Sequence, residues 1–186
     1  MNIAVIPARG GSTRIPRKNI KHFCGKPMLA WSIEAAQKSR CFDLIVVSTD
    51  DEEIAAVARD YGATVPFMRP TALADNYTGT TAVIRHTVQW MLDSDYKLKN
   101  ICCIYATAPF IQPTDLQKSL DQLNRGNSAF VFSTTSFPFP VQRAIIKTEN
   151  GGCYPMFPEH IGKRSQDLEE AFHDAGQFYW AEKPPG

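Results

Sequence analysis

The chain has 186 residues, of which 44 % are hydrophobic and 21 % charged, which is ordinary for a folded domain and excludes disorder over most of the length. This length is typical of a single domain. Twenty basic residues against nineteen acidic ones leave a net charge of +1, which argues against a general nucleic-acid binder or a membrane-surface protein.

Strands and helices are predicted from short apolar runs that alternate with stretches of helical periodicity. The predicted strands are residues 3–6, 43–48, 64–67, 101–105, 129–133 and 177–180. The predicted helices are residues 27–38, 50–61, 81–92 and 113–123. Asp50 is predicted to cap the second helix with Glu53 completing a capping box, and Gly62 to end it. After residue 136 the alternation stops, and 137–140 and 151–158 are interpreted as excursions from the core.

This alternation indicates an α/β fold with a mainly parallel sheet that helices cover on both faces. Ligands of such sheets bind beyond the carboxyl ends of the strands. The segments expected there are 9–19, 49–50 and 106–109.

The cysteines and the first residues of the chain indicate the cellular compartment in which the protein is expected. There are five cysteines, an odd number, and no Cys-x-x-Cys pair. Cys102 and Cys103 lie in an apolar run and are predicted to be buried thiols, which fits a reducing cytoplasm. No apolar run reaches the roughly 18 residues of a membrane span, and the first residues are interpreted as a strand, not a signal peptide.

The loop after the first strand carries the strongest functional signal. It reads Ala8-Arg-Gly-Gly-Ser-Thr-Arg-Ile-Pro-Arg-Lys-Asn19. Gly10 and Gly11 let backbone approach a ligand closely, and four cations within ten residues suit an anion as dense as a triphosphate. The four are Arg9, Arg14, Arg17 and Lys18. The pattern is neither a dinucleotide-binding fingerprint nor a Walker loop; a solvated basic turn is the alternative.

These motifs resemble the CMP-sialic acid synthetase family, cytidylyltransferases that activate acidic nine-carbon sugars. The resemblance rests on Pro7 and the loop of residues 8–19 just given, then on Gly25-Lys-Pro-Met28, Ser48-Thr-Asp50, Arg69-Pro-x-x-Leu-Ala74 and Ala106-Thr-Ala-Pro109 in the same order. It covers nearly the whole chain. Tyr105-Ala-Thr-Ala-Pro-Phe110 and Phe139-Pro-Val-Gln-Arg-Ala144 are most similar to the pseudaminic acid branch, whereas the sialic acid branch commonly has glutamine where Tyr105 stands.

The resemblance implies a three-layer, Rossmann-like nucleotide-diphospho-sugar transferase fold in one domain, residues 1–186. It implies that CTP and an acidic nine-carbon sugar are the substrates, with neither nucleic acid nor membrane as a partner. The residues that it implies for the nucleotide are Ala8, Arg9, Gly10, Gly11, Ser12, Arg14, Lys18, Asn19, Arg69 and Thr80. Those for the sugar are Tyr105, Thr107, Gln166, His173, Asp174 and Gln177. Catalytic roles fall on Arg9, Lys18 and Arg164.

Some features depart from the family pattern. Thr13 stands where lysine is usual, and Arg14 either compensates or points elsewhere. His173 and Ala175 stand where sialic acid members often have Arg and Asn, which fits a different nonulosonic acid. Mg²⁺ is expected by resemblance, but the usual C-terminal Asp-x-Asp is absent, so its ligands stay unknown and the chain is expected to be truncated; a full-length protein would be a homodimer.

Other acidic or histidine groups suggest no clear metal site. Asp93-Ser94-Asp95 has the motif's spelling but is interpreted as a solvated turn. His22, His86 and His160 lack the spacing of metal ligands, and a metal role for Asp50 is a secondary alternative to its capping role.

The activity that the resemblance implies is transfer of CMP to a nonulosonic acid, with pseudaminic acid as the first choice of sugar. The alternatives are an N-acylneuraminate synthetase and an inactive nucleotide-binding remnant.

Overall fold

The computed structural model describes residues 1–126 and 128–183 of the chain. They form two compact units. Unit 1 is built from residues 1–133 together with the chain from Gly176 onward, and unit 2 is residues 134–175. The single domain expected from the sequence stays a prediction, because compact units within one chain can fold together or separately.

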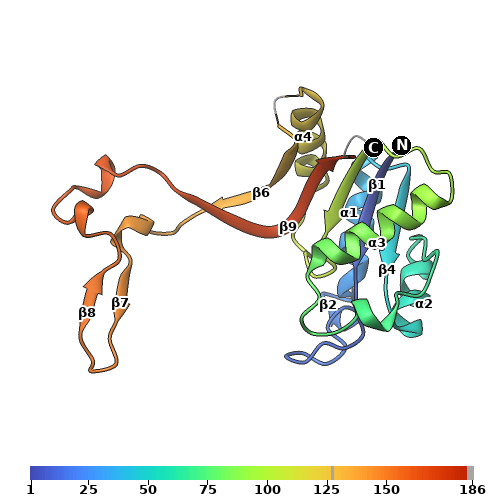
Figure 1. Cartoon of the computed structure of the whole chain (residues 1–186), viewed down its shortest axis with the longest axis horizontal. Coiled ribbons are helices and arrows are strands. Elements are labelled where there is room, and N and C mark those ends of the chain that lie inside the picture. Colours follow the sequence, from blue (N-terminus) through green and yellow to red (C-terminus); the bar gives the residue numbers. More distant parts are fainter. Residues whose placement is uncertain (127, 184–186) are drawn as a thin grey trace. The chain divides into compact units, whose positions relative to one another are not determined.

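A five-stranded sheet in the order β4-β1-β5-β9-β6 has β4, β1 and β5 in unit 1, while β9 and β6 each continue from unit 1 into residues of unit 2 (Figure 1). Its strands are β4 (Leu44–Ser48), β1 (Asn2–Pro7), β5 (Asn100–Ile104), β9 (Phe172–Glu182) and β6 (Phe130–Ser136). β1 runs parallel to both β4 and β5, with Ile3 opposite Leu44 and Ile101. β9 is antiparallel to β5. The mainly parallel sheet expected from the continuous apolar runs is confirmed.

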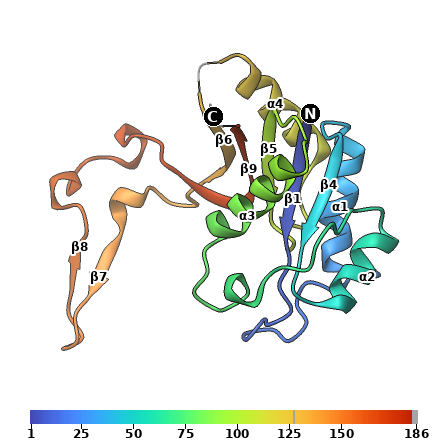
Figure 2. The same cartoon turned by 45° about the vertical axis from the view of Figure 1, so that its right-hand side comes forward.

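Helices cover both faces of this sheet (Figures 1 and 2). α1 (Met28–Ser39), α2 (Glu52–Asp60) and α4 (Pro113–Asn124) bury side chains in one core cluster with the sheet. α3 (Thr80–Asp93) packs on the opposite face, where Met91 meets Ile3 and Val5. The three-layer arrangement predicted from the sequence is confirmed.

Two local predictions were wrong. Residues 64–67 form no strand but only single bridges, Val46 to Thr64 and Thr49 to Met68; Pro66 lies between them and has no amide hydrogen to donate to a ladder. The N-cap of α2 is Asp51, whose carboxylate accepts a hydrogen bond from the amide of Ile54 at 3.0 Å. Asp50 instead accepts from the amide of Gly10 at 3.0 Å.

Unit 2 is a small assembly of short elements. A hairpin pairs β7 (Ile145–Lys147) with β8 (Cys153–Pro155). Single turns of 3₁₀-helix occupy Val141–Arg143, Pro158–His160 and Ser165–Asp167. Arg143 ties two of these segments together by donating to the backbone carbonyls of His160 and Lys163. The residues predicted to leave the core thus form a compact piece of their own.

Two short elements of unit 1 lie outside the main sheet. β2 (His22–Phe23) and β3 (Lys26–Pro27) form a tight hairpin before α1, and Thr71–Leu73 forms a 3₁₀ turn.

Cys102 and Cys103 are buried, as predicted, and burial raises the pKa of the Cys103 thiol to about 12. Among the described residues, no helix has both the length and the apolarity needed to span a membrane.

Candidate functional site

A hollow of about 500 Å³ opens beyond the carboxyl ends of β1 and β5, the place where ligands of such sheets bind. It is called the nucleotide hollow below, after the ligand that the sequence motifs lead us to expect. Its lining residues come from three places: the loop after β1, the segment that leads from Arg69 into α3, and the residues that follow β5. They are Pro7, Arg9, Ser12, Thr13, Arg14, Ile15, Lys18, Asn19, Arg69, Thr78, Thr80, Val83, Tyr105, Ala106 and Thr107.

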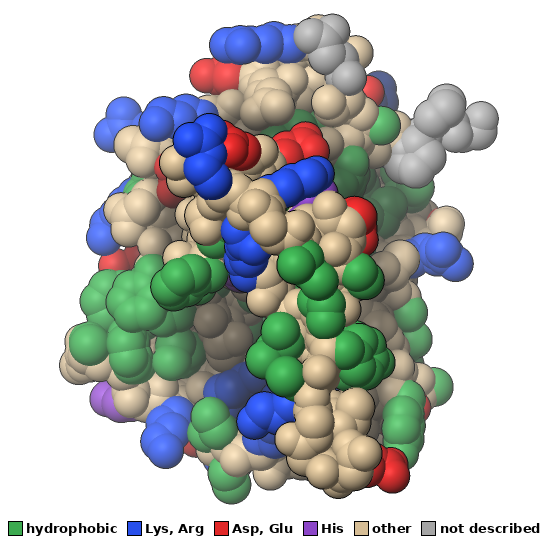
Figure 3. All heavy atoms as spheres, turned by 90° about the vertical axis from the view of Figure 1, so that its left-hand side faces the viewer, with side chains coloured by type: hydrophobic (Ala, Val, Ile, Leu, Met, Phe, Trp, Pro, Cys, Tyr) green, Lys and Arg blue, Asp and Glu red, His purple; other side chains and the backbone are tan. Residues whose placement is uncertain are grey.

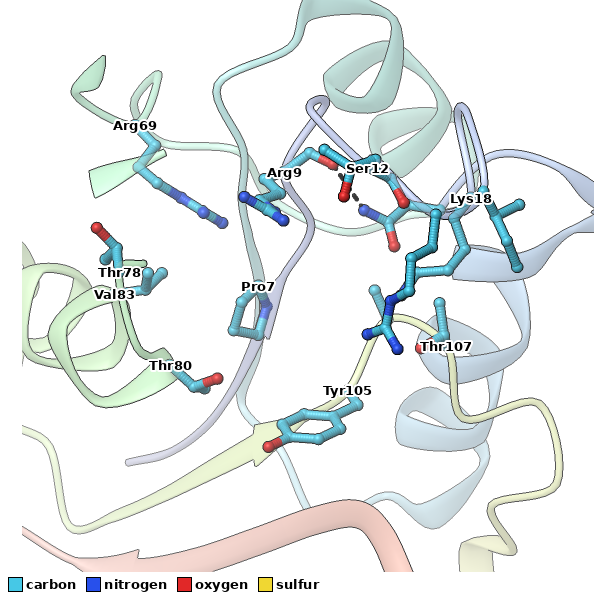
Figure 4. A pocket seen from close by; sticks show the side chains of 15 residues that line it. Pro7, Arg9, Ser12, Lys18, Arg69, Thr78, Thr80, Val83, Tyr105 and Thr107 are labelled. Atoms are coloured by element: carbon cyan, nitrogen blue, oxygen red, sulfur yellow. Dashed lines mark hydrogen bonds between the residues drawn. The ribbon is translucent and has the colours of Figure 1, made fainter. Parts of the chain in front are cut away.

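The lining is strongly cationic. Arg9, Arg14, Lys18 and Arg69 all contribute to it, and none of the described lining residues is acidic. Figure 4 shows the guanidinium groups of Arg9 and Arg69 close together on one side of the hollow, with Tyr105 and Thr107 on another. Such a concentration of positive charge, partly removed from water, favours an anionic ligand with several charges.

Arg69 is fixed more firmly than a surface arginine. Only 6 % of the residue is exposed. Its Nε donates to the hydroxyl of Ser48 at 3.1 Å, and Nη2 donates to the backbone carbonyl of the same residue. Burial lowers the pKa of Arg69, nearby Asp50 opposes that shift, and the like charge of Arg9 adds to it. The guanidinium stays charged because its ordinary pKa is so high, so a ligand anion would relieve an unbalanced charge.

The loop itself is tied down at its base. Asn19 is buried, and its Nδ2 donates to the carbonyl oxygen of Arg9 at 2.8 Å, joining the two ends of the loop. Arg9 in turn donates from Nη1 to the carbonyl of Asp75 at 2.6 Å. The Asp75 carboxylate accepts from the amides of Tyr77 and Thr78, and the hydrogen bonds around it lower its pKa. The loop and the segment before α3 therefore hold each other in place.

The structure brings most of the predicted nucleotide residues together. Arg9, Ser12, Arg14, Lys18, Asn19, Arg69 and Thr80 all line the nucleotide hollow. The other three, Ala8, Gly10 and Gly11, lie outside its lining. Ala8 is fully buried, and its amide donates to the carbonyl of Ser48. The amide of Gly10 donates to the carboxylate of Asp50, and a Cβ added at Gly11 would meet no atom within 4 Å. Arg14, beside Thr13, does face the hollow.

One member of the predicted cation cluster points elsewhere. Arg17 does not line the hollow; its guanidinium pairs with Asp51 and Glu53 at the start of α2. The cations that line the hollow are thus three of the four in the loop together with Arg69, which comes from a distant part of the chain. No local feature of the sequence shows which of the loop cations turns away.

The predicted sugar and catalytic residues divide between the two units. Tyr105 and Thr107 line the hollow in unit 1. Gln177, also in unit 1, accepts a hydrogen bond at its backbone carbonyl from the amide of Tyr105 at 2.9 Å. Arg164, Gln166, His173 and Asp174 belong to unit 2. There Arg164 pairs with Asp167 at 2.7 Å, and the ring of His173 packs edge-on against Phe137.

Sequence reasoning missed several lining residues. Thr78 follows the turn that Asp75 organises, and Val83 lies one helical turn beyond Thr80 on the same side of α3. Asp75 and the polar residues after it indicate a turn in the sequence. Only the fold shows that the Thr78 hydroxyl and the Val83 methyl groups lie at the hollow.

A second, mainly apolar hollow of about 470 Å³ borders the first, since Thr80 and Tyr105 line both. Its lining residues come from α3 and from the strands β5, β9 and β6, all within unit 1. Ile84 and Val88 of α3 face Tyr179 and Phe130 across it. Tyr179 also lies against Tyr105, with ring centroids 5.3 Å apart.

The described residues do not fit a protein-held Mg²⁺ site. They include no group of three or more His, Cys, Asp or Glu side chains arranged to hold a metal, and no carboxylate lines the nucleotide hollow. Asp93 and Asp95, which spell Asp-x-Asp with Ser94, are exposed at the end of α3. No catalytic step is therefore derived through a metal below.

Comparison with known proteins assigns the chain to a family. A family model described as cytidylyltransferase matches residues 3–150. The chain belongs to the cytidylyltransferase family. It is 45 % identical over 179 residues to the pseudaminic acid cytidylyltransferase of Campylobacter jejuni strain 81-176, a match that covers 96 % of this chain and 77 % of that protein. It is 36 % identical to the N-acylneuraminate cytidylyltransferase of Escherichia coli O18:K1:H7, covering 97 % and 42 %.

Solved structures share the fold. A CMP-2-keto-3-deoxy-manno-octonic acid synthetase complexed with CTP matches with a TM-score of 0.69 at 19 % identity, covering 97 % of this chain and 73 % of that one. A 4-diphosphocytidyl-2C-methyl-D-erythritol synthase from Anaerococcus prevotii matches with a TM-score of 0.61 at 12 % identity, covering 97 % and 70 %. The fold is that of nucleotidyltransferases, as the sequence motifs led us to expect.

Proposed function

We propose that the chain transfers CMP from CTP to a nonulosonic acid, pseudaminic acid in the first place, with release of pyrophosphate. The observation that carries this proposal is the nucleotide hollow, where four cations and no acidic residue meet beyond the strand ends of a cytidylyltransferase fold. The relatives named as pseudaminic acid cytidylyltransferases support the choice of sugar. Tyr105, at the position where the sialic acid branch commonly has glutamine, supports it independently.

The proposed reaction is an in-line displacement at the α-phosphorus of CTP. The anomeric hydroxyl oxygen of the sugar forms a bond to that phosphorus, and the bond to the bridging oxygen of the β-phosphate breaks. Among the described residues, no lining side chain is a carboxylate or a histidine, so we assign no general base, and the hydroxyl proton passes to a phosphate oxygen or to solvent. Positioning and neutralisation of charge then supply most of the rate.

Different residues of the hollow would bind the triphosphate, the nucleoside and the sugar. Arg9, Arg14 and Lys18 of the loop, together with Arg69, offset the charge of the triphosphate and of the departing pyrophosphate. Thr80 lies on the α3 side, and the nucleotide would lie between it and the loop. Tyr105 and Thr107 lie on the side where the sugar would approach.

The experiment is an assay of pyrophosphate release from CTP with a panel of acidic sugars. Pseudaminic acid should give the fastest release, and N-acetylneuraminic acid or an eight-carbon keto acid little. Arg9→Ala and Lys18→Ala should each lower turnover by about tenfold or more, since each removes a charge-assisted phosphate contact. Near-normal release in both variants would refute the roles given to these two residues. CTP binding without turnover on any sugar would support a non-catalytic nucleotide-binding protein.

Magnesium and the location of the protein are parts of the same proposal. We propose that Mg²⁺ would be bound with the nucleotide. Because the described residues offer no carboxylate cluster, phosphate oxygens would be its ligands. The comparison is pyrophosphate release with Mg²⁺ and with EDTA. A cytoplasmic location suits free thiols such as Cys24 and Cys153, which are exposed.

A homodimer is also proposed. Unit 2 exposes several large apolar side chains, among them Phe139, 78 % exposed, and Ile161, 66 % exposed. Figure 3 shows hydrophobic side chains at the surface between lysines and arginines. A second copy of the chain would cover such side chains, which water solvates poorly. Light scattering after size-exclusion chromatography should give twice the chain mass, and a monomer at micromolar concentration would refute it.

A further inference from the structure

Arg17 stands out among the basic residues of the loop because it faces away from the nucleotide hollow. Its guanidinium reaches the first turn of α2, where Nη1 and Nη2 both bond to the carboxylate of Asp51, the latter at 3.0 Å. Nη2 also contacts the carboxylate of Glu53. This two-pronged contact is the geometry in which arginine binds a carboxylate most strongly, and lysine cannot reproduce it.

Asp51 connects this ion pair to the rest of the molecule. The same carboxylate caps α2 by accepting from the amide of Ile54 at 3.0 Å. It also packs against Gly10, where an added Cβ would lie 2.6 Å from Oδ2. Asp51 therefore touches the loop where it leaves β1, at Gly10, and again where it returns, at Arg17. The hydrogen bond from Arg17 lowers the pKa of Asp51, so the pair is ionised at neutral pH.

The backbone at Arg17 shows why an anchor is needed. Arg17 has a φ of 55°, in the left-handed region that residues with side chains rarely adopt. Its carbonyl accepts from the amides of Ile20 and Lys21, which closes a tight turn. The next residue, Lys18, lines the nucleotide hollow. The turn thus sends two neighbouring cations in different directions, one to α2 and one to the ligand.

We propose that Arg17 is a positioning residue: by pairing with Asp51 it holds the loop of residues 9–19 in the shape that presents Arg14 and Lys18 to the phosphates of the nucleotide. Arg17 itself touches no substrate. The part of this inference that concerns CTP rests on the proposed function, whereas the anchoring of the loop does not depend on it.

The test uses Arg17→Met, Asp51→Asn and the double variant, with Arg59→Met as the control. Asparagine at position 51 still caps a helix, so this variant removes the ion pair and keeps α2. Arg59 lies in the last turn of the same helix and does not line the nucleotide hollow. Amide hydrogen exchange of residues 9–20 is measured without nucleotide, and CTP affinity is measured by calorimetry.

We expect both single variants to exchange faster over residues 9–20 while the core strands keep their protection. The dissociation constant for CTP should rise by up to about fivefold, a change of about 1 kcal/mol, because the pair is partly exposed to solvent. The double variant should lose no more than either single one, because both remove the same interaction. Arg17→Lys should fall between Arg17→Met and the wild type, and Arg59→Met should match the wild type.

Two results would overturn the inference: unchanged exchange over residues 9–20 in both single variants, or faster exchange across the whole chain with CTP affinity intact, which would mean a general stabilising role. A wild-type chain that does not bind CTP would overturn the proposed function instead. The exchange measurement alone would then decide whether Arg17 holds the loop.

Discussion

Gly10 packs so closely against the start of α2 that we expect even alanine to disturb the loop. A Cβ built on Gly10 would lie 2.6 Å from Oδ2 and 2.9 Å from Cβ of Asp51. Side-chain carbon atoms do not approach this closely, so one of the two must move. Asp51 is not free to swing away, because it caps α2 through Ile54 and is bonded to Arg17.

The size of the effect follows from what Asp51 would lose. Loss of the N-cap costs about 0.5–2 kcal/mol, and overpacking of this kind about 1–3 kcal/mol. The side chains of Arg17 and Asp51 are 39 % and 21 % exposed, so screening limits the pair to about 0.2–1 kcal/mol. These contributions overlap because one displacement causes them all. We therefore expect about 2 kcal/mol, or about 4–8 °C in Tm for a chain of this size.

The assay is thermal unfolding of Gly10→Ala beside Gly11→Ala. Gly11 is the matched control, since its added Cβ would meet no atom within 4 Å and its φ lies outside the left-handed region. Gly11→Ala should keep the wild-type Tm within about 1 °C, because surface substitutions without such contacts cost little. CTP affinity should also fall in Gly10→Ala, whereas Gly11→Ala is a control for Tm alone, because the family resemblance places Gly11 among the residues implied for the nucleotide. Equal melting temperatures in the two variants would show that Asp51 does not hold the loop at Gly10.

Arg69→Lys should raise the dissociation constant for CTP by about tenfold or more, as measured by calorimetry, because lysine cannot donate in two directions to Ser48 as the guanidinium does; an unchanged constant would contradict this role. Acid should weaken the fold partly through Asp51. The hydrogen bond from Arg17 lowers the pKa of this carboxyl, so its contribution is present above the ordinary aspartate pKa of about 3.9 and is lost as the pH falls through the lower folded value. The gap in Tm between the wild type and Asp51→Asn should therefore shrink between pH 6 and pH 3, and a constant gap would exclude the ion pair as its cause. Iodoacetamide at pH 8 should modify Cys24 in the native protein and spare Cys103, whose pKa burial raises to about 12; mass spectrometry of the digested protein decides this.

The sequence allowed the layers of unit 1 to be predicted because burial leaves a clear pattern. Residues 3–6, 44–47 and 101–105 are continuous apolar runs, and they lie in the three parallel strands β1, β4 and β5. The helix ends at Gly62 and at Pro113 were predicted from residues with restricted or unusual backbone preferences. Residues 64–67 misled us because their β-branched character is a weak preference that Pro66 overrides.

The register of the α2 cap illustrates what local patterns cannot decide. Asp50 and Asp51 are equally good capping residues, and Asp50 has the Glu three residues later that favours it. The choice is made by a contact distant in sequence, since the amide of Gly10 takes the carboxylate of Asp50 and leaves Asp51 to cap the helix. A single-residue shift therefore reflects tertiary structure, not an error in propensity.

The same limit applies to the cations of the site. The loop was identified correctly as cationic, but the direction of each side chain depends on partners far along the chain: Asp51 for Arg17, and Ser48 for Arg69. Four positive charges within ten residues suggest one shared ligand, yet one of them is neutralised within the fold. Arg69 was included only through the family resemblance, because nothing near it in the sequence links it to the loop.

These partners leave the two sides of the nucleotide hollow held with different strength. Arg69 is buried and bonded to the end of β4, so its position is as rigid as the sheet. Lys18 lies on a loop that is fixed by Asn19 at its base and by the half-exposed pair of Arg17 with Asp51. Loss of the Arg17 pair is therefore expected to loosen the loop at little cost in stability, whereas substitutions at Arg69 affect both CTP affinity and stability. The ratio of the change in CTP affinity to the change in Tm should accordingly be larger for Arg17→Met than for Arg69→Lys.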